Sequence, residues 1–144
     1  MHMKIAHILK NNKGFTLIEL IVVVIILGLL AAIVGQRVIG QAGKARTQAA
    51  FTQIKIFSNA LTQFKLDTGL YPTTQQGLEA LVKDPGVDKW DGPYLEKNVV
   101  PADPWGQPYH YEYPGSHGDF DLYTYGLDKN PGGDKENQDV TSWQ

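Results

Sequence analysis

Glu19 is the only charged residue in an apolar run of 20 residues that extends from Phe15 to Val34. A helix of that length spans roughly 30 Å at about 1.5 Å per residue, which matches the hydrocarbon core of a bilayer. An acidic side chain is costly in lipid, so it needs a cationic partner. A chain that begins inside lipid would supply such a partner, because its ammonium and the unpaired N–H groups of the first helical turn favour an anion. The sequence therefore predicts that Glu19 forms an ion pair.

A second group of candidate residues lies near the C-terminus, where oxygen donors recur at short spacing. Counted from Asp128 as the first position, the third, seventh and twelfth positions are Asn130, Asp134 and Asp139, with Gly133 sixth. This is a partial match to the calcium loop of an EF-hand. A true EF-hand is excluded because the fifth position is Gly, the twelfth is Asp rather than Glu, and a predicted strand enters the loop. Hard oxygen ligands still suit calcium, while the absence of cysteine and the scarcity of histidine disfavour zinc and copper. Spacing alone leaves a solvated polar loop as an equal alternative.

Catalytic constellations are not found in the sequence. No Ser/His/Asp or Cys/His arrangement can be defended, and no phosphate-binding loop occurs. Asp119 and Asp121 alternate on one face of a predicted strand, with His117 in the turn beside them. A glycosidase pair is conceivable there, but we interpret this segment as an exposed strand edge. We expect the protein not to be an enzyme.

Charge is distributed unevenly along the chain, although the net charge is only -2. Residues 1–66 carry eight Lys or Arg and one acid, whereas residues 67–144 carry five lysines and fourteen acids. The acidic C-terminal part argues against nucleic acid as a partner. Lys4, Lys10 and Lys13 precede the apolar run, so the positive-inside rule predicts a cytoplasmic N-terminus and an exported head. An exported head without cysteine needs a stabilising element other than a disulfide.

The pattern of apolar residues predicts a long helix followed by a small mixed domain. The helix is expected from about Phe15 to Leu66 and ends near Gly69, because apolar residues continue at three- and four-residue spacing beyond the first run. A short helix is expected within residues 75–83, and strands are expected at residues 109–113 and 119–125, where apolar and polar residues alternate. The predicted fold class is α+β, a long helix packed on a head that contains a short helix, a two- to three-stranded antiparallel sheet and a C-terminal loop.

The segment Lys13-Gly14-Phe15-Thr16-Leu17-Ile18-Glu19 resembles the processing site of type IV pilins and pseudopilins. The resemblance implies that a prepilin peptidase cuts between Gly14 and Phe15 and methylates the new N-terminus of Phe15. It also implies that Glu19 neutralises the Phe15 ammonium, on its own chain or on a neighbour in a filament. The expected divisions are a leader at residues 1–14, a transmembrane and filament-core helix at residues 15–40, and a periplasmic domain at residues 41–144.

Motifs of the C-terminal part resemble the major pseudopilin family of type II secretion systems. They are Tyr71-Pro72-Thr73-Thr74-Gln75-Gln76-Gly77-Leu78, Asp103-Pro104-Trp105-Gly106, Gly126-x-Asp128 and Asp139-Val140-Thr141-Ser142-Trp143. The resemblance implies calcium bound in the C-terminal loop. The ligands it implies are the side chains of Asp128 and Asp139 and the carbonyls of Tyr125, Leu127 and Val140, with Asp134 as a further candidate.

The same resemblance implies a structural function. The expected protein is an inner-membrane subunit that polymerises into a periplasmic pseudopilus and drives folded proteins across the outer membrane. Its implied partners are copies of itself, minor pseudopilins, the prepilin peptidase, an inner-membrane platform with a cytoplasmic ATPase, and an outer-membrane secretin. One alternative is a type IV pilin for adhesion or motility, which typically carries a C-terminal disulfide. Another is a membrane-anchored periplasmic enzyme or calcium-dependent binding module.

Overall fold

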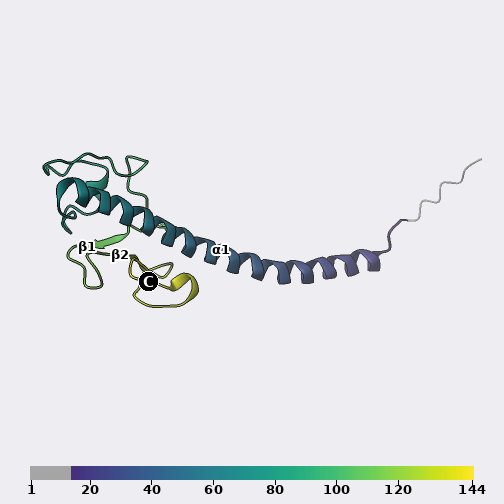
Figure 1. The fold of residues 1–144 in the computed structure, drawn as a ribbon. Coiled ribbons are helices and arrows are strands. Elements are labelled where there is room, and N and C mark those ends of the chain that lie inside the picture. The colour runs from purple at the N-terminus through teal and green to yellow at the C-terminus, as the bar shows by residue number, and fades with distance from the viewer. Residues whose placement is uncertain (1–13) are drawn as a thin grey trace, which may run out of the picture. The chain divides into compact units, whose positions relative to one another are not determined.

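The computed structural model describes residues 14–144, and the predicted leader lies outside the described residues except for Gly14. The described chain divides into two compact units between Ile39 and Gly40. The elements are helix α1, the 3-10 helices η1 and η2 and three short strands (Figure 1). Their bounds are α1 Leu17–Thr68, η1 Leu78–Leu81, β1 His110–Glu112, β2 Asp121–Thr124, η2 Lys135–Asn137 and β3 Val140–Thr141.

Helix α1 is 52 residues long, which confirms the predicted long helix within two residues at each end. It ends at Gly69, whose φ of 96° lies in the left-handed region and whose N–H donates to the Lys65 carbonyl at 2.8 Å. Glycine reaches this conformation without the steric cost that other residues meet, so it terminates the helix.

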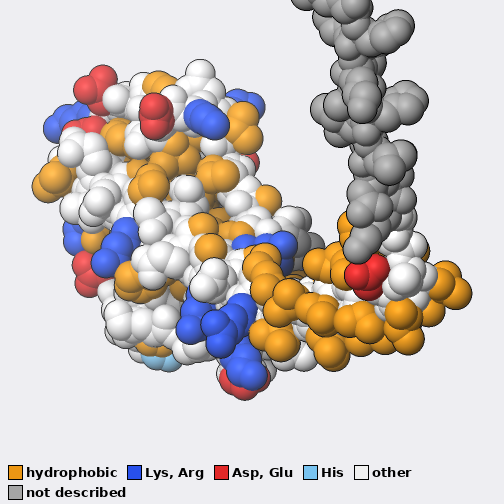
Figure 2. Space-filling model, turned by 90° about the vertical axis from the view of Figure 1, so that its right-hand side faces the viewer, with side chains coloured by type: hydrophobic (Ala, Val, Ile, Leu, Met, Phe, Trp, Pro, Cys, Tyr) orange, Lys and Arg blue, Asp and Glu red, His pale blue; other side chains and the backbone are white. Residues whose placement is uncertain are grey.

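The N-terminal half of α1 exposes almost all of its apolar side chains. Figure 2 shows this as a nearly continuous hydrophobic surface along that part of the helix. The helix is long and apolar enough to cross a membrane, and none of its most apolar stretch is buried within the chain. A surface of this size is stable only in contact with lipid or with other apolar chains.

The C-terminal half of α1 supplies one side of a compact core. Five apolar residues that continue at helical spacing beyond the first run form a stripe, in which Ile54, Phe57, Leu61 and Phe64 are buried and Phe51 is half-buried. The ring of Phe57 meets the ring of Tyr109 edge to face, with centroids 5.2 Å apart. Residues of η1 and of the sheet complete this core. They include Leu78, Ala80, Leu81, Tyr111, Leu122 and Val140.

The sheet is antiparallel, with strand order β1-β2-β3. His110 pairs with Tyr123 in β1 and β2, and Thr124 pairs with Val140 in β2 and β3. Both predicted strands exist but are shorter than the alternating patterns, and the predicted short helix is a single 3-10 turn. The third strand adds only two residues, yet it joins the last part of the chain to the core.

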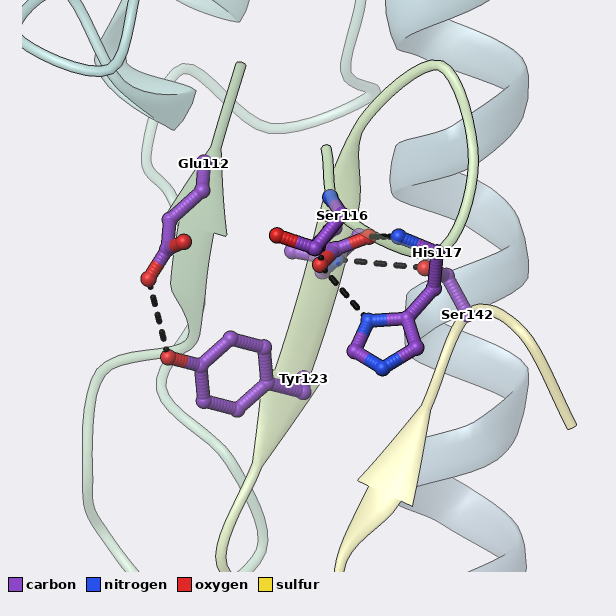
Figure 3. A network of polar contacts seen from close by, with 7 residues as sticks. Glu112, Ser116, His117, Tyr123 and Ser142 are labelled. Atoms are coloured by element: carbon purple, nitrogen blue, oxygen red, sulfur yellow. Dashed lines mark hydrogen bonds and ion pairs between the residues drawn. The ribbon is translucent and has the colours of Figure 1, made fainter. Parts of the chain in front are cut away.

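Asp121 organises the turn between β1 and β2, whose residues Ser116 and His117 are labelled in Figure 3. Its side chain accepts the N–H groups of Ser116 and His117, each at 3.0 Å, and lies 2.8 Å from His117 Nδ1. The His117 ring in turn stacks on Trp143, with ring centroids 4.0 Å apart. The interpretation of Asp121 as part of an exposed strand edge is therefore wrong, because its side chain is only 5% exposed. Alternation alone could not show that the turn folds back over this carboxylate.

Burial of the Asp121 carboxyl raises its pKa, but the hydrogen bonds from His117 and Ser116 favour the charged form and outweigh that effect. The net result is a pKa below the ordinary value of 3.8. A carboxyl whose pKa is lower in the folded state stabilises the fold above the unfolded-state pKa. This contribution is lost as the pH falls through the folded-state value.

We expect Asp121→Ala to lower the free energy of unfolding of the Gly40–Gln144 unit by about 2 kcal/mol, because two backbone N–H groups lose their buried, charged acceptor. The matched control is Asp119→Ala, since Asp119 is exposed and its carboxylate makes only two long contacts, a 3.5 Å ion pair with Lys65 and a 3.4 Å hydrogen bond from the Tyr71 hydroxyl. Urea unfolding at pH 7 and at about pH 3 measures both changes. Equal unfolding free energies for the two variants at pH 7 would contradict a structural role for Asp121.

Candidate functional site

The start of α1 is the first candidate site. Glu19 Oε2 accepts the Thr16 N–H at 3.0 Å and the Thr16 hydroxyl at 3.1 Å, while the Glu19 N–H donates to Thr16 Oγ1 at 3.3 Å. This reciprocal arrangement is a capping box, in which a Thr and a Glu three residues later satisfy each other's free backbone donors. The Thr-x-x-Glu spacing was visible in the sequence, but the role of Thr16 was missed.

Gly14 and Phe15, the residues of the predicted cleavage site, precede the helix and are exposed, Phe15 to 92%. The peptide bond between them is therefore outside the hydrogen-bonded helix. Cleavage there would remove residues 1–14 and create a new N-terminal ammonium group on Phe15. Glu19 would then lie in the first helical turn, four residues after that group. The capping carboxylate is thus already placed in the turn where that cation would appear.

The C-terminal loop is the second candidate site, and the carboxylates at its start and at its end each accept a backbone N–H group of the loop. Asp128 Oδ1 accepts the Asn130 N–H at 3.0 Å, which forms a tight turn at the loop entrance. Asp139 Oδ2 accepts the Gly132 N–H at 2.9 Å, which links the end of the loop to its middle. Both predicted carboxylate ligands therefore face into their own loop.

The other carboxylate oxygen of Asp139 is the most informative atom of this loop. Asp139 Oδ1 is buried and has no hydrogen-bond partner among the described residues. An unpaired buried carboxylate oxygen is costly unless a cation or a donor meets it. The donor set of this loop therefore fits a hard cation, and Asp139 is the residue that would hold it.

Backbone carbonyls also crowd the entrance of the loop. A Cβ atom at Gly126 would lie 2.5 Å from the Glu136 carbonyl oxygen and 2.9 Å from that of Gln138. Gly126 has a φ of 75°, so both its conformation and its surroundings require glycine. The carbonyls of Glu136 and Gln138 therefore pack directly against Gly126 at the entrance of the loop.

The structure distributes the remaining predicted ligands around the same loop. Continuing the register of β2 and β3 places Tyr125 opposite Asp139, and Val140 begins β3. The Leu127 N–H donates to the Glu136 carbonyl at 2.8 Å. Asp134 is exposed and precedes η2, an element that the sequence did not reveal. Within residues 14–144 no three His, Cys, Asp or Glu side chains gather as metal ligands, so a metal here would need the backbone oxygens.

Comparison with known proteins gives consistent matches over nearly the whole chain. Residues 37–143 match the family described as type II secretion system (T2SS), protein G, and residues 9–35 match the prokaryotic N-terminal methylation motif. The type II secretion system core protein G of Pseudomonas aeruginosa is 47% identical over 140 residues, covering 93% of this chain and 96% of that protein. The protein of the same description from Vibrio cholerae is 42% identical over 139 residues, covering 94% of each.

A solved structure is also similar to this chain. The major pseudopilin from the type 2 secretion system of enterohaemorrhagic Escherichia coli is 33% identical and matches with a TM-score of 0.59, covering 73% of this chain and 92% of that one. The fold and the identities agree with the motifs noted in the sequence. The chain therefore belongs to the type II secretion system protein G family.

Proposed function

We propose that this protein is the structural subunit of a periplasmic pseudopilus, which it forms by polymerisation and which drives protein export by type II secretion. The observation that carries the proposal is the apolar surface of α1 from Leu17 to Val34, exposed along its length and broken only by the charge of Glu19, in a chain of this family. Membership in the secretion family favours export over adhesion or motility. The role proposed is structural rather than enzymatic.

Assembly follows from the chemistry of the N-terminal unit. Exposed apolar side chains such as Ile18, Leu29 and Ile33 are stable in lipid, and they are equally stable when packed against the same side chains of neighbouring subunits. Burial of these apolar side chains holds neighbouring subunits together, but it does not specify one register, that is, one axial position of a helix relative to its neighbour. Glu19 provides the register, because the Thr16 hydrogen bonds leave its negative charge in place and that charge is neutralised where it meets the ammonium of Phe15.

Processing and topology follow from the two ends of the apolar segment. The lysines before Gly14 hold the leader in the cytoplasm, where a prepilin peptidase of the inner membrane cuts and methylates Phe15. The Gly40–Gln144 unit lies in the periplasm. The proposed partners are other copies of this chain, minor pseudopilins, the inner-membrane platform with its ATPase, and the outer-membrane secretin.

Calcium is the proposed stabilising ion of the head. Asp128 and Asp139 would hold it with their side chains, and the carbonyls of Tyr125, Leu127 and Val140 would complete the set. The unpaired buried oxygen of Asp139 and the absence of any cysteine support this role. When bound, calcium supplies positive charge that neutralises the two carboxylates and closes the loop.

Glu19 can be tested with two substitutions that separate its charge from its capping bond. Glu19→Gln keeps an acceptor for the Thr16 N–H but removes the charge, whereas Glu19→Ala removes both. We expect both variants to insert into the membrane and to yield at least tenfold fewer filaments, measured by shearing and by electron microscopy. Normal filament yield from Glu19→Gln would show that only the capping bond matters and would contradict the proposed ion pair.

Cleavage is tested by the mass of the purified protein. We expect the mature chain to begin at Phe15 with one added methyl group. Gly14→Val should leave the leader attached, because a bulky side chain replaces the residue before the cut. The control is Gly28→Val, which changes a glycine inside α1 that has no atoms near its Cβ position. A Gly14→Val chain that starts at Phe15 would contradict the proposed site.

Calcium is tested by thermal melting of the Gly40–Gln144 fragment in calcium and in chelator. A ligand present at 100 times its dissociation constant adds roughly 2.7 kcal/mol, which raises the midpoint of a unit this small by about 10 °C. Asp139→Asn keeps an acceptor for the Gly132 N–H but removes the charge, and we expect it and Asp128→Ala to abolish the shift. The exposed carboxylate of Asp88 provides the control, Asp88→Ala. A wild-type midpoint that is equal in calcium and chelator would refute the metal site.

A further inference from the structure

Helix η2 projects one side chain from the C-terminal loop onto α1. Glu136 Oε1 lies 3.1 Å from a guanidinium nitrogen of Arg46, and the two side chains are 24% and 51% exposed. An exposed ion pair of this kind contributes little to stability by itself. Its significance here is that it joins two segments 90 residues apart in the sequence.

Gly43 provides the space for this contact. A Cβ atom at Gly43 would lie 2.6 Å from Glu136 Cγ and 2.7 Å from its Cδ, so any larger residue would displace the Glu136 side chain. Gly43 is also the first buried residue along α1. Glycine lowers helix stability by up to about 1 kcal/mol relative to alanine, so this turn of α1 is weak unless another segment packs on it.

The backbone of Glu136 is attached to the entrance of the same loop. Its carbonyl oxygen accepts the Leu127 N–H at 2.8 Å and lies against the Cα of Gly126. Leu127 is one of the proposed calcium ligands, and Asp128 follows it. One residue therefore contacts both the helix and the segment that would bind the metal.

We propose that Glu136 is the positioning residue that couples calcium binding in the C-terminal loop to the packing of α1 at Gly43 and Arg46. The inference rests on the calcium site proposed above. With the cation bound, Asp128 and Asp139 hold the two ends of the loop together and fix η2, so that Glu136 stays on the helix. Without it, the two carboxylates lose their common counter-charge, the loop loosens, and Glu136 no longer protects the glycine-containing turn.

Coupling of this kind is reciprocal. If calcium keeps Glu136 on α1, then the contact between Glu136 and α1 must also favour calcium. Removing the Glu136 side chain should therefore weaken calcium binding, although Glu136 is not one of the proposed ligands. Filling the space at Gly43 should do the same from the side of the helix.

The test uses the full chain in detergent micelles, with calcium chloride as the probe. Calorimetric titration measures the affinity, and hydrogen exchange of the α1 peptide around residues 43–50 measures protection with and without calcium. We expect calcium to slow exchange in the wild type, and Glu136→Ala and Gly43→Ala to abolish that slowing and to weaken calcium binding by about fivefold. The matched control is Lys135→Ala, the exposed neighbour of Glu136 in η2.

The outcomes separate this inference from the calcium site itself. If the wild type binds no calcium, both the site and the coupling are overturned. If calcium binds but exchange around residues 43–50 is the same in Glu136→Ala as in the wild type, the coupling alone is overturned. The double variant Glu136→Arg with Arg46→Glu exchanges the two charges. Partial restoration of the calcium-dependent slowing of exchange in this variant would confirm that the ion pair carries the effect.

Discussion

Burial of one stripe of α1 is the interaction on which the head depends. Phe57 and Leu61 are completely buried, and the sheet and η1 are too small to form a core without them. At roughly 25 cal/mol per Å² of apolar surface, this stripe is the main source of stability. The helix whose apolar N-terminal half is long enough to cross a membrane is therefore also the largest element of the head.

Buried carboxylates fasten the loops that a disulfide would otherwise hold. Asp103 accepts the N–H groups of Trp105 and Gln107 and the hydroxyl of Thr124, which fixes the turn before β1 to β2. Asp121 holds the turn after β1, and Asp139 holds the C-terminal loop. Hydrogen bonds to a charged acceptor are stronger than those between neutral groups. An acidic head without cysteine thus uses its acids as structural residues, and among the carboxylates that the structure describes only Asp139 retains a buried oxygen without a partner.

Helix α1 takes part in both units of the chain, and the two units have different roles. The N-terminal half of α1 carries the apolar surface and the single acid that suit assembly, and the head carries the loop that suits a cation. The contact of Glu136 with Gly43 lies in the head, close to the division between the two units. A loop that binds calcium could thereby stabilise the part of α1 that leads from the head toward the filament core.

The sequence by itself determined the long helix, the end of that helix at Gly69, the antiparallel sheet and the family. These features depend on the local periodicity of apolar residues, on backbone conformations that only glycine adopts easily, and on short motifs. The lengths of the strands and the 3-10 geometry of η1 were decided by the tertiary structure, because packing determines how many residues of an alternating pattern pair as a strand. The burial of Asp121, the unpaired oxygen of Asp139 and the contact of Glu136 with α1 also required it. Each of these depends on residues distant in the sequence, or on a chain turning back over itself, and no spacing of residue types specifies that geometry.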